Sequence, residues 1–222
     1  MSRDLRLILF DVDGTLADSQ GAITSAMAAA FAGVGLALPS RQDILSIVGL
    51  SLPQAMAELA PGQSAAVQAG LVDGYKSAYK SARLAAGAGH SPLYPGAAEV
   101  LAELNAVPHY LLGVATGKSQ RGLDALIASH ELRCFVTRQC ADHHPSKPHP
   151  SMVLRAMADT GVAPAHTVMI GDTSFDIDMG RAAGVHTIAV NWGFHPAERL
   201  GADHIIDSFA ALAPLLQDIW KD

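Results

Sequence analysis

The residues from Leu7 to Leu16 constrain the fold of this chain more than any other stretch. Four consecutive apolar residues, Leu7 to Phe10, run directly into two carboxylates, Asp11 and Asp13. A short unbroken apolar run is typical of a strand buried on both faces, as in parallel α/β sheets. Such sheets bind ligands at the carboxyl ends of their strands, so Asp11 and Asp13 are predicted to lie in a site.

The spacing of the two aspartates creates an electrostatic problem. Residues two apart on a strand point the same way, so both carboxylates are expected on one side. Two such charges repel by roughly 4 kcal/mol at about 4 Å and an effective dielectric near 20. Another part of the site must relieve this repulsion.

Several later segments resemble the first strand, and helical patterns separate them. Strands alternating with helices of about ten residues predict βαβ units and an α/β fold with a doubly wound parallel sheet. The expected strands are Tyr110–Ala115, Thr167–Ile170 and Val185–Val190, a weaker Cys134–Val136, and a short edge strand within Asp203–Asp207. The expected helices are 97–104, 120–129, 152–158 and 209–220.

The segment from about residue 18 to 92 does not follow this alternation of strands and helices. It contains Ala-, Leu- and Met-rich helical stretches punctuated by Gly and Pro, with no convincing strand. A connection of this length is not a loop. We expect an α/β core of residues 1–17 and 93–222, with a small helical cap of residues 18–92 inserted after the first strand. The alternative is ordinary helices packed on one face of the sheet.

Composition narrows the functional class. The 222 residues carry a net charge of −6 and no Lys/Arg cluster, which argues against a nucleic-acid partner. No apolar run is long enough to span a bilayer, and the start of the chain does not read as a signal peptide. Cys134 and Cys140 lack zinc-type spacing and are expected to be reduced thiols. We therefore expect a cytoplasmic protein with no membrane partner; the sequence gives no prediction of its oligomeric state.

Polar residues follow the other predicted strands as well. Thr116 and Gly117 end one strand, Asp172 ends another, and Asp176 lies one helical turn later. Lys147 lies between them in a proline-flanked loop that would fix its ammonium group. Oxygen-only carboxylate clusters suit Mg²⁺. Together with a lysine, a hydroxyl and backbone amides, they are typical of a phosphoryl site.

Two of these motifs also have simpler interpretations. The Asp-x-Asp-Gly sequence alone favours a turn, but three further motifs accompany it. The sequence from Thr116 to Ser119 resembles the end of a P-loop, yet the required first glycine would fall at Leu112. The P-loop interpretation therefore fails, and Lys118 is expected to be a solvated residue at a helix start.

The motifs together resemble the haloacid dehalogenase (HAD) superfamily, within its phosphatases. The resemblance covers nearly the whole chain, and the helical insert is similar to the cap of phosphoglycolate phosphatase-like members. It rests on four motifs in the family's order: Asp11 to Leu16, Thr116-Gly117, Lys147-Pro148, and Gly171-Asp172 with Asp176.

The resemblance implies catalytic roles. Asp11 would be the nucleophile that forms an aspartyl-phosphate, and Asp13 would be the general acid and base. Lys147 would orient Asp11 and neutralise charge on the transferring group. Thr116 and the Gly117 amide would hold phosphate oxygens.

The resemblance also implies a Mg²⁺ cofactor. Asp172 would ligate the ion together with Asp11 and the backbone carbonyl of Asp13. Asp176 would either help to hold the metal site or fix Lys147.

Two features of the insert bear on the substrate. The turn from Ser46 to Leu50 resembles one that similar phosphatases point into the site, and Gly49 would allow the close approach. Lys76, Lys80 and Arg83 recur with Tyr75 and Tyr79 on one helix face. A solvated face is favoured for this stripe over contact with an anionic substrate.

The predicted function is a Mg²⁺-dependent phosphatase for a small phosphorylated metabolite, with phosphoglycolate as the leading candidate by resemblance. Within the superfamily that the chain resembles, dehalogenases and phosphonatases lack an acid two residues after the nucleophile, so the resemblance implies that Asp13 disfavours carbon–halogen and carbon–phosphorus cleavage. A sugar-phosphate phosphomutase keeps the same aspartates and stays an alternative. A non-catalytic binding protein is the third alternative, disfavoured because it needs neither nucleophile nor acid.

Overall fold

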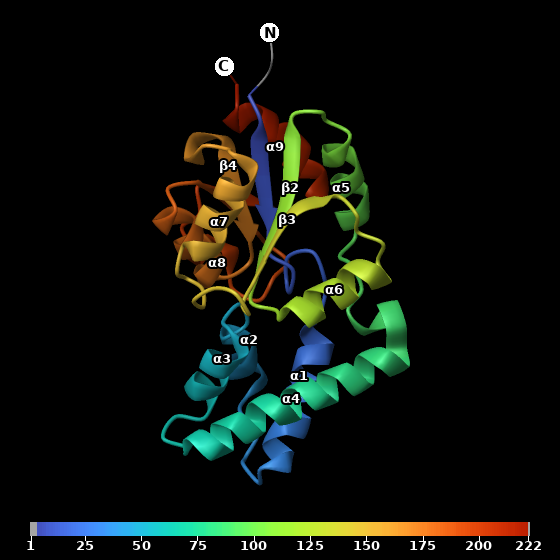
Figure 1. Cartoon of the computed structure of the whole chain (residues 1–222), viewed down its shortest axis with the longest axis vertical. Helices are drawn as coiled ribbons and strands as arrows, with labels where there is room; N and C mark the ends of the chain where they lie inside the picture. The colour runs from blue at the N-terminus through green and yellow to red at the C-terminus, as the bar shows by residue number, and fades with distance from the viewer. Residues whose placement is uncertain (1–3, 222) are drawn as a thin grey trace.

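A computed structural model describes residues 4–221. Figure 1 shows a sheet flanked by helices in the upper part of the molecule and a group of helices below it. All paired strands run parallel, in the order β3-β2-β1-β4-β5-β6. The strands are β1 (Arg6–Phe10), β2 (Tyr110–Thr116), β3 (Phe135–Cys140), β4 (Thr167–Gly171), β5 (His186–Val190) and β6 (His204–Ile206). The α/β class with a doubly wound parallel sheet is confirmed.

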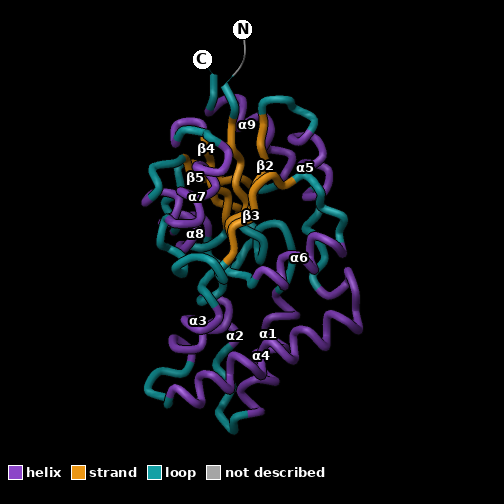
Figure 2. Tube along the Cα trace, in the orientation of Figure 1, coloured by secondary structure: helices purple, strands orange, loops and turns teal. Residues whose placement is uncertain are grey.

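The helices fall into two groups, which Figure 2 separates from the strands by colour. Those of the lower group are α1 (Gln20–Gly33), α2 (Arg41–Ser46), α3 (Leu52–Leu59) and α4 (Ala65–Ala86). Those beside the sheet are α5 (Ala97–Asn105), α6 (Gln120–Ser129), α7 (Ser151–Thr160), α8 (Ser174–Ala182) and α9 (Leu212–Ile219). Among residues 4–221, no helix combines the length and apolarity that crossing a bilayer requires.

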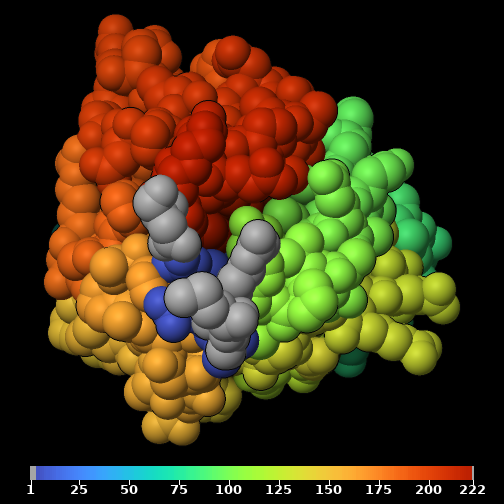
Figure 3. All heavy atoms as spheres, turned by 90° about the horizontal axis from the view of Figure 1, so that it is seen from above, coloured from blue at the N-terminus to red at the C-terminus, as the bar shows by residue number. Residues whose placement is uncertain are grey.

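The two faces of β1 pack into different hydrophobic clusters, as strand periodicity requires. Ile8 and Phe10 join the cluster that includes residues of α5, α6 and α9. Leu7 and Leu9 join the cluster on the other face, with residues of α7 and α8. Figure 3 views the end of the core remote from α1–α4, where the first described residues lie among segments from the middle and end of the chain.

Helices α1–α4 pack around a hydrophobic cluster of their own, which includes Met27, Phe31 and Met56. The chain enters and leaves this group along two adjacent segments. Asp18 N donates to the Pro92 carbonyl at 2.8 Å, and Tyr94 N donates to the Leu16 carbonyl at 2.9 Å. The predicted boundaries at 17/18 and 92/93 fall at this crossing. The division into core and cap domains itself stays a prediction.

Most predicted elements differ from the structure by only one or two residues at an end, and α6 has the predicted bounds. One exception is α9, which begins three residues after the predicted position 209 because residues 209–211 form a 3₁₀ turn. The other is β3, which runs four residues beyond the predicted Cys134–Val136. Its burial alternates, with polar Thr137 and Gln139 buried and Val136 exposed. An apolar-run criterion misses an edge strand of this kind because half of its side chains face away from the core.

Candidate functional site

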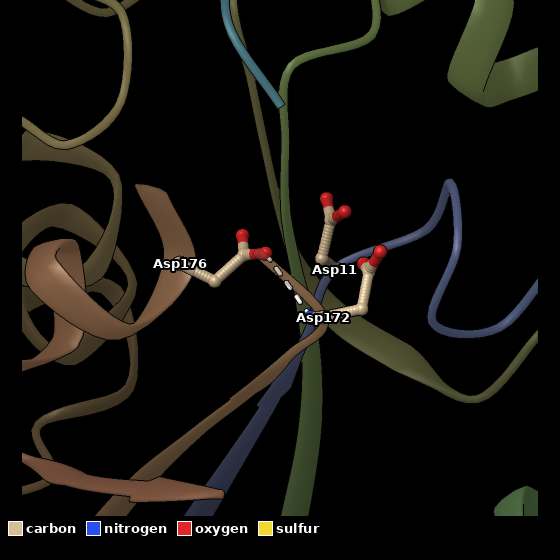
Figure 4. Close-up of side chains that lie close together, drawn as sticks. All are labelled: Asp11, Asp172 and Asp176. Carbon is tan, nitrogen blue, oxygen red and sulfur yellow. Dashed lines mark hydrogen bonds between the residues drawn. The ribbon is translucent and has the colours of Figure 1, made fainter. Parts of the chain in front are cut away.

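Asp11 and Asp172 meet at the point where the strand order reverses. Asp11 follows β1 and Asp172 follows β4, and these adjacent strands connect to neighbours on opposite sides. Ligands bind at this switch point in open α/β sheets. Asp176, from the first turn of α8, completes a buried cluster (Figure 4). One carboxylate oxygen from each of the three aspartates lies within 4.8 Å of the other two.

Lys147 joins two of these carboxylates. Its Nζ donates to Asp11 Oδ1 at 2.8 Å and to Asp176 Oδ1 at 2.6 Å, and its side chain is completely buried. Asp176 Oδ2 accepts from the Thr173 hydroxyl and from two backbone amides, which closes the capping box of α8. Both oxygens of Asp176 are therefore engaged, and the residue positions Lys147.

Asp172 is fixed from two sides. Its Oδ1 accepts from the Thr15 hydroxyl at 2.8 Å, and its Oδ2 accepts from the Phe194 amide at 2.9 Å. Gly14 has φ +85°, and a Cβ there would lie 2.2 Å from Asp172 Oδ2. The glycine of the first motif is thus required both by its backbone conformation and by the close approach of this carboxylate.

Crowding of buried carboxylates governs their protonation. Burial raises the pKa of Asp11 to about 7, although the Lys147 ammonium lowers it. Burial also raises the pKa of Asp172 well above its ordinary value, and the Asp176 and Asp11 charges add to the rise. Burial lowers the pKa of Lys147, but Asp11 and Asp176 outweigh it and raise that pKa overall. A cation bound beside these carboxylates would favour their ionised forms.

Lys118 differs from its predicted place at a solvated helix start. Its Nζ lies 2.7 Å from Oδ1 and 2.9 Å from Oδ2 of Asp13, with both side chains mostly buried. Tyr79 of α4 adds its hydroxyl at 3.2 Å. The interpretation of Lys118 as solvated was wrong, because Asp13, far away in sequence, lies beside it across the strand ends.

Gly117 and Gly49 lie against each other where the two groups of helices meet. A Cβ on Gly117 would lie 2.5 Å from the Gly49 carbonyl oxygen and 2.8 Å from that of Leu50. Gly49 has φ +110°, a conformation that side chains rarely adopt, and its neighbours are Thr173 and Phe175 of the core. Thr116 lies alongside, buried, and its hydroxyl accepts from the Lys118 amide at 3.3 Å.

A cavity of about 750 Å³ separates the strand ends from the lower helices. Asp11, Asp13, Thr116, Gly117 and Gly49 all line it. So do the five residues of the α4 stripe, Tyr75, Lys76, Tyr79, Lys80 and Arg83. From the sequence, a solvated face is favoured for this stripe of α4. In the structure it borders the same cavity as Asp11 and Asp13.

Several residues that shape the site have no role predicted from the sequence. Thr15 lies inside the first motif and holds Asp172, while Thr173 precedes Asp176 and anchors it. Each of these hydroxyls lies close in the sequence to an aspartate of a motif, and this proximity is the sequence feature that could have pointed to its role. No sequence feature of this kind marks Tyr79, because Lys118 is distant in the sequence and only the fold brings α4 beside it.

The sequence matches a known protein family. Residues 8–190 match the sequence model of the haloacid dehalogenase-like hydrolases. The chain belongs to this family. The match spans β1 to β5 and includes every residue of the cluster described above, so the resemblance inferred from the motifs is confirmed.

Several curated relatives of this HAD hydrolase are named as phosphatases. A probable phosphatase IndB of Dickeya dadantii is 34% identical over 92% of this chain and 90% of the relative. An N-acetylmuramic acid 6-phosphate phosphatase of Pseudomonas aeruginosa is 33% identical over 91% of each. A phosphoglycolate phosphatase of Chromobacterium violaceum is 30% identical over 97% of this chain and 98% of the relative.

Solved structures share the whole fold. A haloacid dehalogenase-like family hydrolase from Streptococcus pneumoniae matches with a TM-score of 0.81 and 26% identity, over 96% of this chain and 99% of that one. Together these likenesses support a hydrolase of the HAD type.

Proposed function

We propose that this HAD hydrolase is a Mg²⁺-dependent phosphatase that acts on a small phosphorylated metabolite. One observation carries the proposal: Asp11, fixed by Lys147, and Asp13, fixed by Lys118, face one cavity at the switch point of the sheet. A nucleophile and an acid placed together serve hydrolysis of an ester, whereas a binding protein needs neither.

In this proposal Asp11 attacks phosphorus and forms an aspartyl-phosphate, while Asp13 protonates the leaving alcohol. Asp13 then takes a proton from the water that releases phosphate. Thr116 and the Gly117 amide hold phosphate oxygens, and Lys147 offsets their charge. Lys118 holds the carboxylate of Asp13 at the cavity through two short contacts, and one of these contacts is given up when Asp13 carries the proton for the leaving alcohol.

The donor set fits Mg²⁺. Asp11 and Asp172 offer buried oxygens near one point, without a nitrogen or sulfur ligand in the cluster. They would hold the ion with the backbone carbonyl of Asp13, while Asp176 supports the site through Lys147 and the Asp172 amide. When bound, the ion neutralises charge on the carboxylates and on the transferring phosphoryl group.

We further propose that residues 18–92 act as a cap that excludes water from the cavity during the first step. The contact of Gly49 with Gly117 and the hydrogen bond from Ser51 N to Ser146 Oγ, at 2.8 Å, support this role. Both join the lower helices to loops that carry site residues.

Release of inorganic phosphate tests the proposal. Wild type should release phosphate from several small phosphate esters with Mg²⁺ and almost none after the metal is chelated. A phosphomutase would instead return the phosphoryl group to an isomer of the substrate and would need an activating bisphosphate. A folded protein that releases no phosphate from any ester contradicts the phosphatase proposal.

A further inference from the structure

The cavity is much larger than a phosphoryl group requires. Its volume is about 750 Å³. Cavities of about 300 to 1,000 Å³ commonly hold ligands of drug size. A two-carbon acid attached to the phosphate would leave most of this space to water.

One part of the wall is apolar and aromatic. Ile23 and Met27 of α1 line it together with Ile47. Tyr75 and Tyr79 stack with ring centroids 5.6 Å apart and planes inclined by 24°. A wall of apolar and aromatic side chains favours a ligand with a flat ring over a ligand with only a short alkyl group.

Tyr75 also offers a polar group to this space. In the chain as described, its hydroxyl has no hydrogen-bond partner, although the residue lines the cavity. Burial raises the pKa of Tyr75 well above its ordinary value, so the phenol keeps its proton as a donor.

The rim of the cavity is basic. Lys76, Lys80 and Arg83 follow one another along α4, and Arg121 of α6 joins them in the lining. Within residues 4–221 none of these four side chains forms a hydrogen bond or ion pair. With Lys118, five of the 15 Lys and Arg residues of an acidic chain line one cavity, and Asp13 neutralises only one of them.

Acidic residues in the lining do not balance this rim. Asp11 and Asp13 are engaged by Lys147 and Lys118. Asp142, the other carboxylate in the lining, accepts from the backbone amide of Gln120. The excess positive charge therefore remains for a ligand.

Building on the proposed phosphatase function, we propose that the substrate is a phosphate ester of a ring-sized alcohol that carries an anionic group of its own. The ring lies against Tyr75, Tyr79 and the apolar wall, and the second anion binds Lys80 and Arg83. A carboxylate and a second phosphate share the required chemistry. The basic residues of the cavity rim thus determine which alcohol is accepted. The residues at the strand ends bind and transfer the phosphoryl group.

Matched substrates test this inference. The probes are phenyl phosphate, 4-carboxyphenyl phosphate and benzene-1,4-diyl bisphosphate, with phosphoglycolate as the small anionic ester. Wild type should show kcat/KM at least about tenfold higher for an anionic ring than for phenyl phosphate. Phosphoglycolate should be a poorer substrate than the anionic rings, and the better of the two rings identifies the anion.

The double variant Lys80→Gln/Arg83→Gln should lose most of this preference. The ratio between two substrates in one preparation cancels any loss of folded protein. Arg41→Gln removes a charge from the exposed start of α2, outside the cavity lining, and should keep the wild-type ratio. Phosphatase activity with no preference for the anionic rings, or a preference that survives the double variant, overturns this inference alone. Absence of phosphate release from all four esters overturns the proposed function as well.

Discussion

Lys118 Nζ lies 2.7 and 2.9 Å from the two carboxylate oxygens of Asp13, and the hydroxyl of Tyr79 lies 3.2 Å from the same ammonium group. The contact joins a core strand end, the proposed acid and a helix of the lower group. Because both carboxylate oxygens are held, Asp13 has little freedom to rotate. The carboxylate is thereby positioned before any substrate binds, and Asp13 must exchange one contact with Lys118 for a proton to act as the acid.

Replacing Lys118 by Met should therefore impair protonation of the leaving group. We expect kcat/KM to fall by about 10²-fold for an alkyl phosphate, since general acid catalysis contributes about 10²- to 10⁴-fold. The loss should be much smaller for p-nitrophenyl phosphate, whose leaving group needs no proton. Steady-state kinetics on the two esters measure this difference. Equal losses on both would mean that Lys118 serves only the structure.

Gly117→Ala should weaken catalysis by pushing the proposed cap away from the strand ends. The new Cβ would lie 2.5 Å from the Gly49 carbonyl oxygen, so the turn from Ser46 to Leu50 must move away. A displacement of about 1 Å near reacting groups can cost about 10²-fold in rate.

Gly21→Ala is the matched control, because a Cβ there meets no atom within 4 Å. Turnover of phenyl phosphate by the two variants gives the comparison. Full activity of Gly117→Ala would show that the close contact between the two glycines is dispensable.

The acidic cluster predicts a pH dependence of stability. The pKa of Asp11 is about 7 in the folded chain and near 3.8 when unfolded, so the folded state retains a proton over that interval. Without metal, the free energy of unfolding should fall as pH rises from about 4 to about 7. Asp172 has a raised pKa too and acts in the same direction.

Mg²⁺ should reverse this loss, because it binds ionised carboxylates. The increase in Tm on adding Mg²⁺ should be larger at about pH 8 than at about pH 5. Asp172→Asn should abolish most of the increase. Thermal unfolding in chelated and Mg²⁺-containing buffers measures both. An increase that is the same at either pH, or that persists in Asp172→Asn, would place the metal elsewhere.

The sequence predicted those parts of the site that obey a local rule. Asp11 and Asp172 were found because each follows a strand buried on both faces, and parallel strands end at one edge. Lys118 was misjudged because its partner lies 105 positions away in the chain. Its neighbours suggest only a helix start. The role of Tyr79 depends on how α4 crosses the strand ends, which no local pattern encodes.

The strands likewise divide into those that a local sequence pattern predicts and those that depend on tertiary contacts. Apart from Arg6 and Thr167 at their first positions, β1 and β4 are apolar or glycine, so the apolar-run pattern predicts them directly. The edge strand β3 was predicted too short because Thr137 and Gln139 are buried through hydrogen bonds rather than apolar contact. Gln139 Nε2 donates to the Thr137 hydroxyl at 2.7 Å and to Asp159 at 2.9 Å. Burial of this kind depends on tertiary partners.

The most direct test of the central claim asks whether phosphate passes through Asp11. Asp13→Asn lacks the base that activates water, but it should still accept a phosphoryl group from p-nitrophenyl phosphate, a good leaving-group ester. After mixing with Mg²⁺ and acid quenching, mass spectrometry of the peptides should find one added phosphoryl group on Asp11. The double variant Asp11→Asn/Asp13→Asn should carry none. A phosphoryl group on another residue, or undiminished phosphate release by Asp11→Asn, would contradict the account.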